Sequence, residues 1–294
     1  MKKYKAIFFD WDGTAVLSRR APVRSAVGAM APLLDGGVKL AIVSGTTYDR
    51  IAGGQLHRHF TEKQLENLYL GLGRGAFNYA FDQGEPYVFA DRVPDERTRG
   101  AIHRAAFHIH MELLEKYGLN TDIVFNRPNY CKIDLAAGID RGDNLFMQAG
   151  ETEALQSTLQ SLGIGGLRCL IDMAGAAGAA HGLAVSPTCD GKYLEVGLSD
   201  KSDNVDAILQ KIMASDGIAP EDCCFWGDEF IALEEGIYGS DSFMRTALTA
   251  CADFFDVSDL PGDRPPAVKV LGGGVDRFLS FLREQAALPA VPDR

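Results

Sequence analysis

Three short apolar runs, far apart in the chain, each end directly in residues suited to acid–base or anion-binding chemistry. Residues 7–9 lead into Asp-Trp-Asp-Gly-Thr at 10–14, residues 41–43 into Ser-Gly-Thr at 44–46, and residues 224–226 into Gly-Asp-Glu at 227–229. Runs of this kind are typical of strands buried on both faces of a sheet. One acidic residue after a strand could simply cap a helix or start a turn. Three such ends are not easily explained by turn chemistry, so the pattern predicts one shared site at the edge of a parallel sheet.

Strands and helices alternate in the two outer parts of the chain. The expected strands are 5–9, 38–43, 67–72, 223–226 and 253–257, and the expected helices are 22–34, 202–213 and 275–287. Residues 44–56 are predicted to form a loop that enters a helix, and residues 75–89 a hairpin. The βαβα order implies a parallel sheet covered by helices on both faces, where ligands bind at the carboxyl ends of the strands. The predicted fold class is therefore α/β, with a Rossmann-like parallel sheet as its core.

The middle of the chain follows a different pattern. We expect a long helix at 95–117, strands at 122–125 and 132–136, a helix at 152–162, a Gly/Ala-rich loop at 174–184, and strands near 183–186 and 193–196. This mixture predicts a separate α+β module. The predicted organisation is a core of residues 1–91 and 197–294, interrupted by an inserted α+β cap of residues 92–196.

Composition excludes several classes of function. The 294-residue chain has a formal net charge of −11, which argues against a general nucleic-acid binder because a polyanion would be repelled. No charge-free apolar run is long enough to span a bilayer, and the apolar stretch 6–9 is too short for a signal peptide. The six cysteines lack CxxC spacing, and Cys223 and Cys224 lie in an apolar run, as buried reduced thiols do. These features predict a cytoplasmic protein without a membrane span.

The residues at the strand ends suit phosphoryl transfer. Asp10 and Asp228 would form a hard oxygen site of the kind that Mg²⁺ prefers. Asp12 could protonate a leaving oxygen and later activate water. Ser44 and the amides that follow it could hold phosphate oxygens, as could a lysine, and Gly13 permits a tight turn near the phosphate.

Taken together, these motifs resemble those of the haloacid dehalogenase superfamily. The segment 10–14 is similar to its DxDGT signature, 43–47 to its Ser/Thr motif and 227–229 to its acidic motif. Lys201, at the start of a helix after the cap, matches its lysine motif, although Ser202 stands where a glycine commonly follows. The resemblance covers nearly the whole core and the place where the cap is inserted.

The resemblance implies a role for each matched residue. Asp10 would be phosphorylated and would bind Mg²⁺, and Asp12 would act as general acid and base while contacting the ion through its backbone carbonyl. The predicted phosphate-binding residues are Thr14, which would also support the loop, Ser44, Gly45 and Lys201, and the predicted metal ligands are Asp10, Asp12, Asp228 and Asp241. The second carboxylate on the metal side is either Glu229 or Asp241. The spacing from the Gly-Asp pair to Asp241 is longer than in many relatives and similar to that in phosphomannomutases, which favours Asp241.

The cap segment 123–143 carries cationic and amide side chains among alternating apolar residues. Arg127, Asn129, Lys132 and Arg141 are either solvent-facing strand residues or a patch that faces the core and binds the distal part of a substrate. In phosphomannomutases a similar cap region with arginines holds the distal phosphate.

The position of the cap resembles the group that contains trehalose- and sucrose-phosphate phosphatases, phosphomannomutases and Cof-type phosphatases. The expected function is that of a Mg²⁺-dependent phosphohydrolase, which would react through an aspartyl-phosphate. Its substrate would be a small phosphate ester, and the likeness to this group favours a sugar phosphate. Two alternatives stay open: a sugar phosphomutase, and a non-catalytic regulator that binds a sugar phosphate. The expected partner is the small substrate alone, with the chain a monomer or a homodimer.

Overall fold

The protein is described by a computed structural model that covers residues 2–137, 150–189 and 192–289. Its largest element is an eight-stranded sheet with the order β14-β13-β10-β1-β2-β3-β4-β5. The strands are β1 (Ala6–Phe9), β2 (Lys39–Ser44), β3 (Leu68–Leu72), β4 (Phe77–Asp82), β5 (Glu85–Asp91), β10 (Cys223–Gly227), β13 (Asp253–Asp256) and β14 (Val268–Val270). The six strands from β14 to β3 are parallel, and the hairpin β4–β5 extends the sheet in antiparallel fashion.

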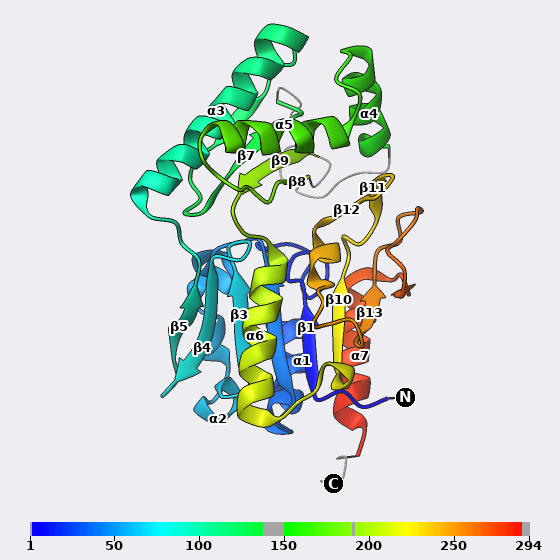
Figure 1. Ribbon diagram of the computed structural model, residues 1–294. Coiled ribbons are helices and arrows are strands. Elements are labelled where there is room, and N and C mark those ends of the chain that lie inside the picture. The colour runs from blue at the N-terminus through cyan, green and yellow to red at the C-terminus, as the bar shows by residue number, and fades with distance from the viewer. Residues whose placement is uncertain (1, 138–149, 190–191, 290–294) are drawn as a thin grey trace.

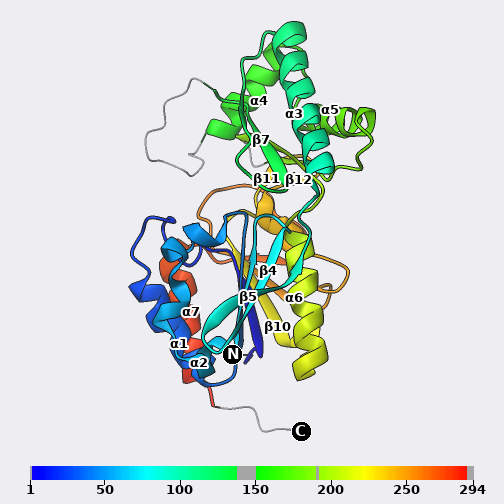
Figure 2. The ribbon, with the colours of Figure 1, turned by 90° about the vertical axis from the view of Figure 1, so that its left-hand side faces the viewer.

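Helices cover both faces of this sheet, because its central strands are apolar on both sides. The helices α1 (Arg24–Asp35), α2 (Glu62–Leu65) and α7 (Gly274–Ala287) lie on one face, and α6 (Lys201–Asp216) lies on the other (Figure 2). Along β1, Ile7 and Phe9 pack into the cluster that includes α1 and α7, whereas Ala6 and Phe8 pack into the cluster of α6. This alternation places β1 in the middle of the core, and its carboxyl end points toward the second part of the molecule (Figure 1).

That second part is an α+β cap above the carboxyl edge of the sheet (Figure 1). Its antiparallel sheet has the order β6-β7-β9-β8. The strands are β6 (Asp122–Val124), β7 (Tyr130–Asp134), β8 (Thr188–Cys189) and β9 (Tyr193–Gly197), and the helices are α3 (Glu96–Tyr117), α4 (Glu151–Ser161) and α5 (Leu167–Ala180). On the cap sheet, Ile133 and Leu194 pack into the apolar cluster with the cap helices. The adjacent residues Lys132 and Glu195 lie on the other face, toward the core domain, and line the cavity there. The predicted fold class, a Rossmann-like core with an inserted α+β cap, is confirmed.

The predicted domain limits stay a prediction, although the elements lie near them. The cap elements run from Glu96 to Gly197, one residue past the predicted end of the cap. The long helix begins at the N-cap Asp95 and ends at Gly118, whose φ of 68° is the left-handed conformation that glycine adopts readily.

Two sequence expectations in the loops were wrong. The Gly/Ala-rich stretch was expected to be a loop, but its residues up to Ala180 form the second half of α5. The strand that follows is β8 at Thr188–Cys189, and not the strand expected near 183–186. Alanine is the strongest helix former, and Gly178 is required by packing because an added Cβ would lie 2.7 Å from Val185.

After Ser44 the chain forms three short 3₁₀ helices, η1 (Tyr48–Arg50), η2 (Ala52–Gly54) and η3 (Leu56–His59), instead of entering an α-helix. Gly53 and Gly54, with positive φ, interrupt any regular helix there.

A small hairpin of the core anchors the far side of the cap. Its strands are β11 (Ala232–Glu234) and β12 (Ile237–Tyr238), and Leu233 and Ile237 belong to the apolar cluster of the cap. The Glu234 carboxylate accepts hydrogen bonds from the backbone N–H groups of Leu167 (2.6 Å) and Arg168 (3.3 Å), at the start of α5. The cap is therefore held to the core by this hairpin as well as by its two connecting segments.

Two further expectations concern the membrane and the cysteines. Of the helices in the described ranges, none has the length and apolar content needed to cross a membrane. All six cysteines are free, and Cys223 and Cys224 are buried in β10 as expected.

Candidate active site

Side chains from both sheets line a cavity of about 360 Å³ between the core and the cap. It brings together Asp10, Asp12, Ser44, Gly45 and Lys201 from the core with Arg127 and Lys132 from the cap, all of them predicted site residues. They come together because β1 and β2 are adjacent parallel strands and α6 begins at the same edge. Of the third predicted strand end, Glu229 lines this cavity, whereas Asp228 lines a neighbouring pocket beside Gly13.

Lys201 lies at the centre of the acidic groups. Its Nζ is 2.8 Å from Asp10 Oδ1 and 2.8 Å from Asp241 Oδ1, and all three residues are buried. Burial alone would lower the pKa of Lys201, but the charges of Asp10 and Asp241 raise this pKa well above its ordinary value. The lysine is therefore held as a cation beside the predicted nucleophile.

Asp241 organises the loop that follows β10. Its Oδ2 accepts hydrogen bonds from the backbone N–H groups of Asp228 (3.0 Å) and Glu229 (2.8 Å), while Oδ1 accepts from Lys201. A Cβ at Gly227 would overlap the Asp241 carboxylate, so a glycine is needed for this approach. Glu229 is more exposed and accepts a hydrogen bond from Ser240 (2.7 Å). The choice of Asp241 over Glu229 as the second carboxylate on the metal side stays a prediction. Both oxygens of Asp241 accept hydrogen bonds from protein donors.

Asp228 packs against the loop after β1. Its Oδ1 accepts a hydrogen bond of 2.8 Å from Thr14, and a Cβ at Gly13, whose φ is 87°, would overlap its carboxylate. The hydroxyl of Thr14 is thus engaged with Asp228, and its predicted role in phosphate binding stays a prediction. Burial, together with the charges of Asp241 and Glu229, raises the pKa of Asp228 well above its ordinary value.

The second aspartate of the motif has the surroundings of a general acid. Asp12 Oδ2 lies 3.2 Å from a guanidinium nitrogen of Arg19, and within the described ranges Oδ1 is buried without a hydrogen-bond partner. Burial raises the pKa of Asp12 and Arg19 opposes that shift. A carboxyl group with a raised pKa can hold a proton nearer neutral pH, as proton donation requires.

The donor set at this edge fits Mg²⁺. Burial raises the pKa of Asp10 well above its ordinary value, as it does for Asp228, so both carboxylates would be stabilised by a nearby cation. Among the residues that the structure describes, no three His, Cys, Asp or Glu side chains form a metal cluster. An ion here would be held by Asp10, Asp228 and the predicted backbone carbonyl of Asp12, with water and substrate completing its shell. Few carboxylates and several waters are what Mg²⁺ favours.

The end of β2 and the residues that follow it present hydroxyl groups to the cavity. Ser44 and Thr46 both line it and are nearly inaccessible, and the Ser44 Oγ accepts a hydrogen bond of 3.3 Å from the Thr46 N–H. In the part of the chain that is described, the Thr46 Oγ is buried and has no partner. The sequence motif already contained this threonine, but nothing in the pattern distinguished it as a site residue.

The cap supplies the opposite wall of the cavity from the polar face of its sheet. Lys132 Nζ pairs with Glu195 Oε1 at 2.7 Å and lies 4.7 Å from the ring centre of Tyr193. Arg127 lies in the turn between β6 and β7 and donates to Asn126 Oδ1 at 3.2 Å. Their predicted substrate contacts stay predictions, and Arg141 lies outside the described residues.

Asn129 is placed differently from the other predicted cap residues. It is buried, and its Nδ2 donates to the backbone carbonyls of Gly73 (2.8 Å) and Arg74 (3.3 Å) in the core. Its amide therefore joins the cap to the loop after β3.

Arg74 is a site residue that the sequence did not reveal. It is buried, and its guanidinium reaches from the core into the cap, where it pairs with Glu195 Oε2 (2.8 Å) and donates to Thr188 Oγ1 (2.7 Å) and the Ser186 carbonyl (2.8 Å). Burial alone would raise the pKa of Glu195, but Lys132 and Arg74 lower it to about 2. Because this pKa is depressed, the carboxylate stabilises the fold above its ordinary pKa, and the contribution is lost as the pH falls toward 2.

Removal of Arg74 is expected to destabilise the protein strongly. Arg74→Met would leave a buried carboxylate with one cation fewer, and breaking a buried pair typically costs about 3–5 kcal/mol. The matched control is Arg92→Met, because Arg92 forms an exposed pair with Asp203 (3.3 Å) and should cost less than about 1 kcal/mol. Urea denaturation measures both, and equal losses for the two variants would contradict this assignment.

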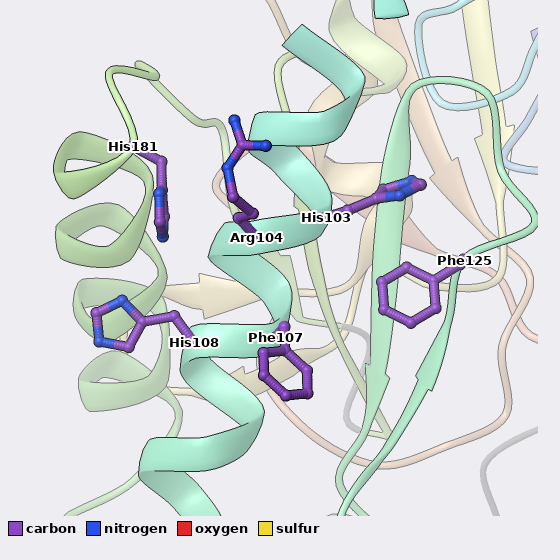
Figure 3. A pocket seen from close by; sticks show the side chains of 6 residues that line it. All are labelled: His103, Arg104, Phe107, His108, Phe125 and His181. Carbon is purple, nitrogen blue, oxygen red and sulfur yellow. The ribbon is translucent and has the colours of Figure 1, made fainter. Parts of the chain in front are cut away.

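A larger cavity lies on the cap surface, away from the predicted nucleophile. Its volume is about 570 Å³, and it is lined by three histidines, two phenylalanines and Arg104 around α3 (Figure 3). His108 and His181 face each other with ring centres 5.9 Å apart. The described lining contains no carboxylate or hydroxyl side chain, so this cavity lacks the groups needed for phosphoryl transfer.

Comparison with solved structures identifies the fold. The chain is similar to an N-terminally truncated IMP-nucleotidase from Plasmodium falciparum, with a TM-score of 0.58, 13% identity, and coverage of 97% of this chain and 70% of that one. It is similar to the sucrose-phosphatase from Synechocystis sp. in complex with sucrose and phosphate, with a TM-score of 0.54, 13% identity, and coverage of 97% and 98%. It is also similar to a trehalose-6-phosphate phosphatase from Aspergillus fumigatus, with a TM-score of 0.57, 15% identity, and coverage of 97% and 93%.

The chain shares its fold with these three enzymes, which are phosphatases of the haloacid dehalogenase superfamily. The expectation drawn from the motifs agrees with this fold. No protein-family model and no curated protein matches the sequence. At these low identities the likeness concerns the fold, and the activity has to be argued from the site.

Proposed function

We propose that the protein is a Mg²⁺-dependent phosphohydrolase that acts on a small sugar phosphate through an aspartyl-phosphate on Asp10. The observation that carries the proposal is the meeting of Asp10, Asp12, Ser44 and Lys201 in one cavity, with Lys201 Nζ 2.8 Å from Asp10. These groups supply a nucleophile, an acid, a hydroxyl donor and a cation, which phosphoryl transfer requires.

The proposed reaction has two steps. In the first, an Asp10 carboxylate oxygen attacks phosphorus, the P–O bond to the sugar breaks, and the leaving oxygen takes a proton from Asp12. In the second, Asp12 takes a proton from water, which attacks the aspartyl-phosphate and releases inorganic phosphate with Asp10 regenerated. Lys201 and the Ser44 hydroxyl would hold phosphoryl oxygens in both steps. A bound Mg²⁺ would supply charge neutralisation at the phosphoryl group.

Two observations favour a sugar phosphate as the substrate. The cavity is lined by polar and charged side chains together with Tyr130 and Tyr193, which suits a hydroxyl-rich molecule. Two of the similar structures are phosphatases of sucrose phosphate and trehalose 6-phosphate. Since another is an IMP-nucleotidase, a nucleotide is the natural competitor in any test.

Phosphate release across a substrate panel tests this function. With Mg²⁺ present, we expect at least one sugar monophosphate to have a higher kcat/KM than IMP, without need of a bisphosphate activator. A requirement for such an activator would indicate a mutase. Absence of phosphate release from every ester, p-nitrophenyl phosphate included, would reject the proposal.

Arg127 is expected to recognise the part of the substrate beyond the transferred phosphate. Loss of a hydrogen bond from a charged group typically costs about 1.5–3 kcal/mol, which is roughly 10- to 150-fold in kcat/KM. Arg127→Ala should show this loss on the best sugar phosphate and hardly any on p-nitrophenyl phosphate, which has no sugar. An equal fall on both substrates would assign Arg127 to the fold or the chemistry instead.

A further inference from the structure

The cavity on the outer surface of the cap is lined by one guanidinium group and five rings. Its volume is about 570 Å³, and its lining consists of His103, Arg104, Phe107 and His108 of α3, Phe125 after β6 and His181 after α5. Figure 3 shows His108 and His181 on one side of α3 and Phe125 on the other. The proposed reaction uses none of these residues, so nothing in it accounts for this lining.

One side of the cavity holds a positive charge that the described protein leaves unpaired. The Arg104 side chain is exposed, and within residues 2–137, 150–189 and 192–289 no carboxylate oxygen lies within 4.0 Å of its guanidinium group. His108 is one helical turn further along α3, on the same face, and its ring meets that of His181 edge to face with ring centres 5.9 Å apart. In a chain with a net charge of −11, this side therefore offers a cation and two imidazoles to an acidic group.

The other side of the cavity presents apolar rings to water. Phe107 and Phe125 are 54% and 43% exposed, and the ring centre of His103 lies 5.0 Å from that of Phe125. Burial and the charge of Arg99 lower the pKa of His103, so this imidazole is held neutral. A flat aromatic molecule could lie against these rings, because aromatic pairs stack with an offset or meet edge to face. It would also cover apolar surface that is now in contact with water.

Two other occupants fit this lining less well. A metal ion would be repelled by Arg104, and the part of the chain that is described contains no group of three His, Cys, Asp or Glu side chains placed to hold one. A second copy of the chain, joined about a two-fold axis through this cavity, would bring Arg104 and the imidazoles against their own counterparts. Like charges placed opposite each other disfavour such an interface.

We propose that this cavity is a binding site for a small aromatic anion, whose acidic group contacts Arg104 and whose ring lies against Phe107 and Phe125. Carboxylate, sulfonate and phosphate groups all present a pair of oxygens that a guanidinium group can bind with two hydrogen bonds. This inference does not depend on the proposed phosphatase activity, because it rests on other residues of the cap.

The site lies on the opposite side of the cap sheet from the catalytic cavity. Ile109 of α3 and Ile133 of β7 pack in the same apolar cluster, whereas Lys132, the neighbour of Ile133 on β7, lines the catalytic cavity. Successive side chains of a strand point to opposite faces of the sheet, so α3 and the catalytic cavity are separated by the cap sheet. Both cavities can therefore be occupied at the same time, and the aromatic anion is not expected to compete with the substrate.

Three ligands that separate charge from aromaticity test the proposal: 2-naphthoate, its neutral analogue 2-naphthamide, and the saturated decahydronaphthalene-2-carboxylate. In calorimetric titration of the protein, we expect 2-naphthoate to bind at one site per chain and at least about 10-fold more tightly than 2-naphthamide, the gain typical of a hydrogen bond to a charged group. It should also bind more tightly than the saturated acid, which cannot stack. Arg104→Met should remove the preference for the anion, and Phe107→Ser should weaken the binding of both naphthyl ligands. Both side chains are exposed, so the two variants should keep the urea midpoint of the unaltered protein.

Arg97→Met is the matched control, because Arg97 is an exposed arginine of the same helix that does not line the cavity, and this variant should keep the full affinity. Arg127→Met should keep it too, since Arg127 lines the catalytic cavity instead. Absence of saturable binding of 2-naphthoate, equal affinity for 2-naphthamide, an unchanged preference in Arg104→Met, or loss of binding in Arg127→Met would overturn the inference. So would sedimentation that shows a dimer which Phe107→Ser dissociates, because a second copy of the chain would then cover the cavity.

Discussion

Replacement of Asp10 by asparagine is expected to lower kcat by a factor on the order of 10⁴ or more, because it removes the nucleophile from a covalent mechanism. The amide is isosteric with the carboxyl group and can still accept a hydrogen bond from Lys201. Burial among acidic groups raises the pKa of Asp10, so the neutral amide is also compatible with the fold. We therefore expect loss of turnover with an unfolding midpoint in urea close to that of the unaltered protein.

A surface aspartate provides the control for this substitution. Asp82 is exposed at the end of β4, far along the strand from the carboxyl edge of the parallel sheet, and Asp82→Asn should leave kcat unchanged. Near-normal turnover in Asp10→Asn would contradict the assignment of the nucleophile. Loss of turnover accompanied by unfolding would mean that the variant tests stability rather than chemistry.

Removal of divalent cations is the second change expected to have a large effect. Asp10 is buried and Asp228 is half-buried, and desolvation together with neighbouring carboxylates raises the pKa of each well above its ordinary value. Excess chelator should reduce phosphate release to the background rate, and added Mg²⁺ should restore it. Ca²⁺ should restore little, because its larger and more flexible coordination shell would misplace the carboxylates and the substrate.

Asp228→Asn links this effect to the predicted ligand. It should increase the Mg²⁺ concentration needed for half-maximal activity, whereas Asp82→Asn should not. Full activity in excess chelator would be incompatible with the proposed metal site.

The sequence predicted the core well because its signals are local. Each central strand is an apolar run, and the polar residue of interest stands at the end of that run. Because β1 and β2 are adjacent and parallel, Asp10 and Ser44 could be predicted to lie at the same edge of the sheet. Helix α3 was likewise delimited by the capping residue Asp95 and by Gly118. By contrast, α5 was missed because glycines obscured a helix whose alanines favour it and whose Gly178 is needed for packing.

The parts of the site that the sequence did not reveal depend on distant contacts. Arg74 pairs with Glu195, which follows 121 positions later, and neither residue lies in a recognisable motif. Periodicity and motif spacing carry no information about such pairing, so these residues required the folded arrangement.

A covalent phosphate on Asp10 can be detected directly by trapping the intermediate. The enzyme would be mixed with saturating substrate and Mg²⁺, quenched in acid within a single turnover and treated with borohydride, which reduces an acyl phosphate to an alcohol. The proposed mechanism predicts that the peptide containing residues 10–14 is reduced at Asp10, and that this product is absent without substrate and in Asp10→Asn. Hydrolysis with normal burst kinetics but no reduction at Asp10, or reduction at another carboxylate, would contradict it.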